Sequence, residues 1–104
     1  MHATIRRYEG VDQNRASELT GKMNETLVPK LSKLPGFRAY YLVEGGNGVI
    51  SSFGLFETRE QADESTIVAD GWVRDQELQT AFPNPPRTTS GKVVTHENGV
   101  AVSY

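Results

Sequence analysis

Two apolar segments, 37–43 and 49–56, flank the glycine-rich sequence Gly45-Gly46-Asn47-Gly48. Asparagine and glycine both tolerate positive φ angles, so Asn47-Gly48 predicts the tight turn of a β-hairpin. Successive side chains of a strand point to opposite faces of the sheet. In the first segment the two alternating sets are Phe37, Ala39, Tyr41 and Val43, and Arg38, Tyr40 and Leu42. In the second they are Val49, Phe53 and Leu55, and Ile50 and Phe56. Since a free face of an antiparallel sheet is normally polar, two largely apolar faces predict a sheet that is covered on both sides.

A strand and a helix are predicted before this hairpin. Residues 3–8 have the composition of a short strand. Asp12 supplies an N-cap oxygen for a helix. Pro29 lacks the backbone N–H of a regular helix, so we expect a kink or break near Val28, and Pro35-Gly36 predicts the end of the helix. Apolar residues recur along it every three or four positions, at Ala16, Leu19, Met23, Leu27, Leu31 and Leu34.

A second helix and further strands are predicted after the hairpin. Thr58 and Gln61 have the spacing of a capping box, in which each side chain accepts a hydrogen bond from the backbone N–H of the other. The proline-rich sequence 83–86 breaks the regular structure, and residues 90–97 predict a fourth strand. Asn98-Gly99 is another hairpin signal, with 100–104 as a fifth strand. The second helix carries Ala62, Ala69, Trp72 and Val73 on one side.

This order of elements predicts a ferredoxin-like βαββαβ fold of the α+β class, with a four-stranded antiparallel sheet and two helices on one face. The 104 residues fit a single domain, 1–104, with 98–104 as a C-terminal extension. A single domain of this size has no element left to cover the second face of the sheet. A second copy of the chain is the simplest cover, so we expect a homodimer.

The composition excludes several classes of function. The chain has no cysteine, which removes disulfides, thiolate nucleophiles, zinc fingers and iron–sulfur clusters. A formal net charge of −2 gives no basic field for nucleic acid. No apolar run approaches the roughly 20 residues of a membrane-spanning helix, and the N-terminal residues show no signal peptide. We therefore expect a small cytoplasmic protein that binds neither nucleic acid nor membranes.

Four stretches of the sequence resemble the antibiotic biosynthesis monooxygenase-like (ABM) family of dimeric α+β barrels. They are Leu34-Pro35-Gly36-Phe37, the strand and cap 48–58, the helix start 59–65, and Pro85-Pro86 followed by Ser90-Gly91-Lys92-Val93. The resemblance implies a ferredoxin-like domain whose sheet packs on that of a second copy to form a barrel. The family includes cofactor-free oxygenases of polyketide aromatics and haem-degrading enzymes, so the fold alone does not decide the activity.

The resemblance argues against haem degradation. Haem-degrading members of the family carry an Asn in the first strand and a Trp and a His in the second helix. Here Met1–Glu9 contains no Asn, the position of the Trp falls near Ser65, and no His occurs between Thr58 and Phe82. The members that oxidise polyketide quinones place Asn, Trp, Tyr and Arg around an aromatic substrate.

Five residues are candidates for binding a ligand, the first four because they have these residue types: Asn24, Arg38, Tyr40, Trp72 and His96. Trp72 is either a core anchor or a wall that stacks on a flat ligand. Arg38, in a covered strand, needs an anionic partner, which is either an intersubunit salt bridge or the carboxylate or enolate of a ligand. Tyr40 either packs with its hydroxyl satisfied or donates to a ligand, and His96 is either a surface residue or a base.

Met23, Leu27, Trp72 and Val73 either line a pocket between the helices and the sheet or close on one another and leave no cavity. The acidic residues of the second helix are expected to be solvated: Asp63, Glu64, Asp70 and Asp75. Arg6 and Arg7 are adjacent, so only one of them can point inward. No catalytic residue is assigned from the sequence.

Two functions remain open. The first, which the resemblance implies, is a cofactor-independent monooxygenase-like enzyme acting on a small aromatic or polyketide-like molecule. Arg38 and Tyr40 would donate hydrogen bonds to an enolate that itself reduces dioxygen, and Trp72 would stack on it. The second is a non-catalytic dimeric protein that binds a small molecule or serves as a partner subunit. Because cysteine is absent, the two histidines are distant in sequence and no dinucleotide-binding glycine pattern is present, we expect no metal, haem, flavin or nicotinamide.

Overall fold

The computed structural model describes residues 1–76, 78, 81–82 and 84–97. In these residues the strands are β1 (His2–Tyr8), β2 (Phe37–Gly46), β3 (Val49–Phe56) and β4 (Arg87–Lys92). A helical run between β1 and β2 consists of η1 (Gln13–Arg15), α1 (Ala16–Lys22), η2 (Met23–Leu27) and α2 (Val28–Ser32), and α3 (Arg59–Asp75) follows β3.

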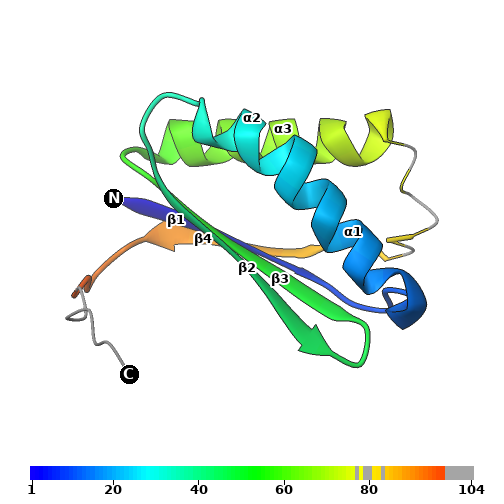
Figure 1. Cartoon of the computed structure of the whole chain (residues 1–104). Helices are drawn as coiled ribbons and strands as arrows, with labels where there is room; N and C mark the ends of the chain where they lie inside the picture. The colour runs from blue at the N-terminus through cyan, green and yellow to red at the C-terminus, as the bar shows by residue number, and fades with distance from the viewer. Residues whose placement is uncertain (77, 79–80, 83, 98–104) are drawn as a thin grey trace, which may run out of the picture.

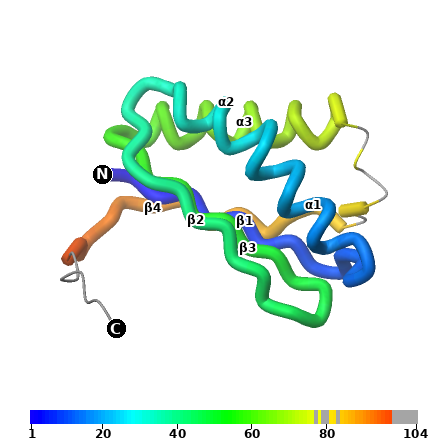
Figure 2. The backbone as a smooth tube through the Cα atoms, viewed as in Figure 1, coloured from blue at the N-terminus to red at the C-terminus, as the bar shows by residue number. Residues whose placement is uncertain are grey.

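The strands form one antiparallel sheet in the order β2-β3-β1-β4. The helices lie together on one face of this sheet, as Figures 1 and 2 show. The molecule therefore has two layers, one of helices and one of strands, and β1 and β3 are the central strands. This arrangement confirms the ferredoxin-like α+β fold predicted from the order of the elements. In the described part of the chain, no helix is long and apolar enough to cross a membrane.

The first helical run begins where the sequence predicts but passes through Pro29 without a break. Asp12 caps it, because its side chain accepts a hydrogen bond of 2.9 Å from the N–H of Asn14. The turn before the proline, Met23–Leu27, is a π-helix, in which the N–H of Val28 bonds to the carbonyl of Met23. Proline removes a helical hydrogen bond and crowds the preceding turn. A widened turn accommodates this, so the predicted irregularity is present without a break.

The hairpin between β2 and β3 has the predicted turn, with φ of 53° at Asn47 and 77° at Gly48. Its pairing corrects one prediction. A β-bulge between Phe37 and Ala39 shifts the alternation, so Phe37 pairs with Phe56, and their ring centroids lie 5.8 Å apart. The prediction that Phe37 shares a face with Ala39 was wrong, because an extra residue in one strand reverses the faces beyond it.

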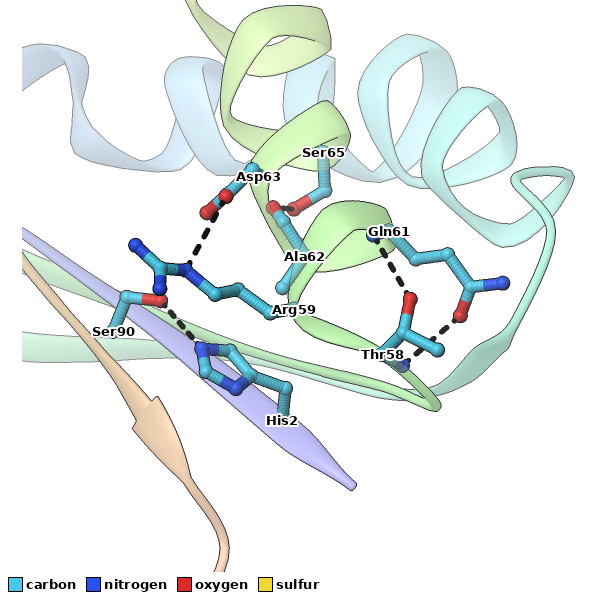
Figure 3. A network of polar contacts seen from close by, with 8 residues as sticks. All are labelled: His2, Thr58, Arg59, Gln61, Ala62, Asp63, Ser65 and Ser90. Carbon is cyan, nitrogen blue, oxygen red and sulfur yellow. Dashed lines mark hydrogen bonds and ion pairs between the residues drawn. The ribbon is translucent and has the colours of Figure 1, made fainter.

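The start of α3 confirms the predicted capping box, which Figure 3 shows. The hydroxyl of Thr58 accepts a hydrogen bond of 3.2 Å from the N–H of Gln61, and the side-chain oxygen of Gln61 accepts one of 3.1 Å from the N–H of Thr58. Gly36 lies against this cap with a φ of 77°, and a Cβ there would come within 1.7 Å of the Gln61 oxygen. The loop before β2 is thus fitted to the beginning of α3.

The core lies between the two layers. Its apolar side chains come from the helical run, from α3 and from the inner faces of β1 and β3, and the largest fully buried ones are Trp72, Phe56, Leu19, Met23 and Ile50. The predicted apolar stripe of the first helix is buried, since Leu19, Met23, Leu27 and Leu31 are each at most 3% exposed.

The last strand differs from its prediction. We expected residues 90–97, but β4 spans Arg87–Lys92 and pairs with β1. Val94 lies beyond β4 and is 89% exposed, so the two valines that suggested the strand are not part of it. Serine and threonine can occupy an edge strand because pairing with β1 uses only the backbone. The predicted hairpin at 98–99 and fifth strand at 100–104 lie outside the described residues.

The face of the sheet opposite the helices is largely apolar over β1, β2 and β3, polar at β4, and not covered by any described part of the chain. We call it the open face, and none of its apolar residues is buried: Ala3, Ile5, Ala39, Tyr41, Val43, Val49, Phe53 and Leu55. Tyr41 and Val43 are 60% and 46% exposed. The sequence prediction of apolar residues on both faces of the hairpin is therefore confirmed.

We expect Gly36→Ala to lower the free energy of unfolding by about 1–3 kcal/mol, because alanine is strained at this φ and displaces the Gln61 side chain from the capping box. Gly71→Ala is the matched control: it lies within α3, and the nearest atom to its added Cβ, on Arg74, is 3.8 Å away. It should raise the free energy by roughly 0.5–1 kcal/mol. Urea denaturation measures both, and a neutral Gly36→Ala would show that the loop and the cap are not coupled.

Candidate functional site

Arg6, in the middle of β1, is a buried cation between the sheet and α3. The residue is only 4% exposed. One terminal nitrogen of its guanidinium donates a hydrogen bond to the carboxylate of Asp70, and the other donates one of 3.3 Å to the carbonyl of Thr66. The guanidinium also lies 5.6 Å from the centre of the Tyr8 ring. A buried charge requires such partners, because it has lost its contact with water.

A cleft of about 280 Å³ opens beside this cation. Residues from β1, from α3, and from positions 82 and 84–86 form its walls: Arg6, Tyr8, Asp70, Val73, Phe82, Asn84, Pro85 and Pro86. The Tyr8 and Phe82 rings contact each other with centroids 4.7 Å apart. Asn84 donates a hydrogen bond of 3.2 Å to the carbonyl of Glu9, which holds the segment 84–86 against β1. Apolar walls with a few polar groups are typical of small-molecule sites.

Tyr8 contributes a hydroxyl that remains protonated. Burial raises the pKa of Tyr8 above its ordinary value of 10.0, and the charge of Asp70 raises it further, while the charge of Arg6 acts in the opposite direction. The cleft thus combines a permanent cation at Arg6, a hydrogen-bond donor at Tyr8 and a carboxylate at Asp70. The Asp70 side chain is 57% exposed, so it lies at the mouth of the cleft, whereas Arg6 lies at its base.

Sequence reasoning did not assign this cluster to a site. Asp70 was expected to be solvated with the other acidic residues of its helix, but it pairs with Arg6. The available signal was the alternation of β1: Arg6 lies in phase with Thr4 and Tyr8, all three of which are buried, whereas Arg7 is exposed and pairs with Glu9. The sequence indicated that one of the two arginines points inward, and the structure shows that it is Arg6.

Trp72 is a core residue and does not line any of the described pockets. It is 1% exposed, and its indole N–H donates a hydrogen bond of 2.7 Å to the hydroxyl of Thr26 on η2. Of these four residues, Met23, Leu27 and Trp72 are buried in the core, and Val73 lines the cleft at Arg6. The apolar side chains of the two helices fill the space in which a pocket was one of the two alternatives.

Asn24 and Tyr40 do lie together, in a separate groove between the first helical run and β2. Tyr40 also lines a small cavity deeper between the layers, which Arg6 borders as well. Burial raises the pKa of Tyr40 above its ordinary value of 10.0, and hydrogen bonding with Ser52 and the charge of Arg6 oppose this effect. Two polar residues also line the groove, Thr20 on α1 and Glu44 on β2. The hydroxyl of Thr20 donates a hydrogen bond of 2.8 Å to the carboxylate of Glu44.

Arg38 and His96 lie away from these pockets. Arg38 is exposed at the β-bulge and forms an ion pair of 2.6 Å with Glu57, so its anionic partner is within its own chain. His96 is exposed and lies beyond the end of β4, not in the predicted last strand. Across residues 1–76, 78, 81–82 and 84–97, no group of three histidine or acidic residues is arranged to hold a metal ion.

Proteins of known structure share this fold. No protein-family model and no curated protein sequence matches the chain. Solved structures do match it. An antibiotic biosynthesis monooxygenase superposes with a TM-score of 0.70 at 14% identity, over 91% of this chain and 100% of that one. A monooxygenase of Streptomyces coelicolor in complex with nanaomycin D gives 0.67 at 14% identity, over 98% and 92%.

A third structure is a mutant of MhuD with two manganese protoporphyrin IX molecules in each active site, which gives a TM-score of 0.74 at 16% identity, over 95% of this chain and 100% of that one. Two further structures of the same fold, from Nitrosomonas europaea and Bordetella bronchiseptica, are described as putative antibiotic biosynthesis monooxygenases. The resemblance to the ABM family is therefore confirmed at the level of the fold.

We expect Tyr8 and Tyr40 to ionise above pH 10.0, because burial disfavours the charged phenolate. Since the unfolded chain ionises these groups first, their contribution to stability is complete below pH 10 and is lost as the pH rises through the folded pKa values. Ultraviolet absorbance titration of the wild type, Tyr8→Phe and Tyr40→Phe measures this. Each variant should lack one of the two tyrosine ionisations that occur at the highest pH. If both variants keep both of these ionisations, the assignment is contradicted.

Proposed function

We propose that the protein binds a small, flat aromatic molecule with an acidic hydroxyl in the cleft at Arg6, and that it oxidises this molecule with dioxygen without a bound cofactor. One observation carries the proposal: a buried guanidinium lies at the base of a largely apolar cleft. Arg6 would bind the phenolate or enolate oxygen, and Tyr8 would donate a second hydrogen bond. Phe82, Pro85 and Val73 provide apolar walls for an aromatic ring.

Each polar residue of the cleft would have a separate role in the reaction. Asp70, at the mouth, accepts the proton of the acidic hydroxyl. Arg6 and Tyr8 stabilise the resulting anion, whose electrons reduce dioxygen directly. At a ring methylene beside the phenol, one atom of dioxygen replaces the two hydrogens and forms a carbonyl group. The other oxygen atom leaves with these two hydrogens as water. The reaction thus needs only the substrate and dioxygen.

Two solved structures of the same fold support a ligand of this shape. One holds nanaomycin D, and the other holds a metalloporphyrin, both of them flat ring systems. A second candidate function is binding without catalysis. The residues that line the cleft in the described part of the chain include no histidine, so Asp70 is the group available there to act as a base. Turnover in the presence of oxygen separates the two functions.

Binding can be tested with dihydroxyanthrone, a flat phenol that has an oxidisable methylene. We expect Arg6→Met to weaken its binding about tenfold or more, because a hydrogen bond to a charged group contributes about 1.5–3 kcal/mol. Calorimetry gives the Kd and an oxygen electrode gives the turnover. Anthracene, which has a similar shape and no hydroxyl, should bind Arg6→Met and the wild type equally.

Arg59→Met is the matched control, since it removes the same charge from an exposed position on α3, where the side chain is 76% exposed. It should leave the Kd unchanged. Equal affinity of Arg6→Met and Arg59→Met for the phenol would refute the assignment of the site, and binding without oxygen uptake would select the non-catalytic function. Haemin is a further probe, and its reductive degradation would overturn the cofactor-free proposal.

We also propose that a second copy of the chain covers the open face and makes the protein a homodimer. The support is the pairing of apolar residues across β1, β2 and β3, where Ile5 lies opposite Phe53 and Phe53 opposite Tyr41. A contiguous apolar surface of this kind is typical of an interface. The two copies would meet sheet to sheet, and the site at Arg6 would lie on the far side of each sheet from the interface.

We expect sedimentation at micromolar concentration to show twice the chain mass of 11.5 kDa. Phe53→Asp should give monomers or aggregates, because dimerisation would bury an unpaired charge. Ile67→Asp is the control, since Ile67 is an exposed apolar residue on α3, 64% exposed, on the other layer. It should remain a dimer. A wild type that sediments only at the mass of one chain would refute the dimer.

A further inference from the structure

We propose that the cleft selects its ligand as a neutral acid that brings its own proton, and that Asp70 discriminates against ligands that are already anions. The inference rests on the proposed function, because it concerns the form in which the same ligand enters the same cleft. It makes Asp70 a specificity-determining residue as well as a base. What decides the preference is that the charge of Arg6 is already paired inside the protein.

The Arg6 guanidinium has one charged and one neutral partner in the described part of the chain. One terminal nitrogen donates to the carboxylate of Asp70, and the other donates to the carbonyl of Thr66 at 3.3 Å. Arg6 and Asp70 thus form a pair without net charge, and both line the cleft. The other described residues of its lining carry no charge at neutral pH, so the cleft as a whole is neutral.

An anion that forms outside the cleft would lose more than it gains by entering. It would exchange water for walls that are largely apolar, which is costly for a charge. It would also share Arg6 with Asp70, whose negative charge repels it. The Asp70 side chain is 57% exposed at the mouth, so this repulsion begins at entry. A neutral hydroxyl avoids both costs, since it donates its hydrogen to Asp70 and accepts one from Arg6.

Tyr8 is a phenol of the protein itself in this cleft, and it experiences the same effects. Burial is the largest influence and raises the pKa of Tyr8 above its ordinary value of 10.0, the charge of Arg6 lowers it, and the charge of Asp70 raises it again. The net shift of the pKa is upward, although the centre of the ring lies 5.6 Å from the guanidinium. A phenolic group beside Arg6 thus stays neutral while Asp70 is charged.

A ligand that enters neutral can still become an anion inside the cleft. When its hydroxyl proton moves to the carboxylate of Asp70, the negative charge moves from Asp70 to the ligand oxygen, and Arg6 then has the ligand as its anionic partner. The cleft holds one positive and one negative charge before and after this step. The proton returns to the hydroxyl of the product, because the water that forms takes both of its hydrogens from the methylene.

Two ligands of matched shape separate charge from size: anthracenecarboxylate, an anion at neutral pH, and anthracenecarboxamide, which is neutral and offers both an N–H and a carbonyl. We expect calorimetry on the wild type to give a Kd about tenfold or more lower for the carboxamide, because the anion loses its hydration and meets the charge of Asp70. This comparison decides the matter even if a variant of Asp70 does not fold. Equal affinities, or tighter binding of the carboxylate, would overturn the inference.

Asp70→Asn should reverse the preference. It keeps the shape of the side chain and leaves Arg6 without its anionic partner, so the carboxylate should bind about tenfold or more tighter than it binds the wild type. In the double variant Arg6→Met with Asp70→Asn, where neither charge is left buried alone, this gain should disappear. Asp75→Asn is the matched control, because it removes the same charge from an exposed position of α3 outside the cleft. It should leave the ratio of the two affinities as in the wild type.

The outcomes separate this inference from the proposed function. If dihydroxyanthrone binds through Arg6 but the wild type binds the carboxylate and the carboxamide equally, the preference for a neutral ligand is wrong and the cleft proposal stands. If dihydroxyanthrone does not bind, while the wild type prefers the carboxamide and Asp70→Asn reverses this, the proposed substrate is wrong and the role of Asp70 stands. A carboxylate that binds Asp70→Asn no more tightly than the wild type would refute that role.

Discussion

The ion pair between Arg6 and Asp70 determines how the two layers meet. A guanidinium on the inner side of a central strand is unfavourable unless the covering helix supplies partners for it. Thr66 and Asp70 are four residues apart on α3 and therefore lie on the same side of the helix, where both reach Arg6. The capping box at Thr58 fixes where the helix begins. Together, the cap and the buried charge set which side of α3 faces β1.

The space between the layers has an apolar part and a polar part. Trp72, Leu19 and Met23 fill the apolar part, and the one indole N–H there is satisfied by Thr26. The polar part comprises the groove at Tyr40 and the cleft at Arg6, and a small cavity with an almost wholly apolar surface lies between them. Tyr40 separates the groove from the cavity, and Arg6 separates the cavity from the cleft.

The sequence predicted the fold well because its signals are local. Periodicity gave the helices, the Asn47-Gly48 turn gave the hairpin, and Thr58 with Gln61 gave the start of α3. The predictions were wrong where pairing with a neighbouring strand determines which face a residue lies on or which residues form a strand. The bulge after Phe37 reverses its face, and pairing with β1 makes a strand of the Thr- and Ser-rich residues of β4 instead of the valines that follow.

The candidate site was harder to predict than the fold. Arg6 and Asp70 are far apart in sequence, and each belongs to a residue type that is usually solvated. Their partnership depends on the packing of α3 over β1, which no local pattern encodes. Trp72 and Arg38 were better candidates by residue type, yet one is enclosed in the core and the other is paired with Glu57 at the surface. Residue type identifies polar groups, but burial and pairing decide which of them can act on a ligand.

The site and the open face share the strand β1. In β1, Thr4, Arg6 and Tyr8 point to the helices while Ala3, Ile5 and Arg7 point away, and β3 alternates in the same manner. Arg6 itself therefore lies on a strand whose other face is largely apolar and uncovered. A second copy packed on that face would exclude water from it and restrain β1 and β3 without touching the cleft. Assembly would then act on the site through the strands themselves, which links the orientation of the buried cation to the oligomeric state of the protein.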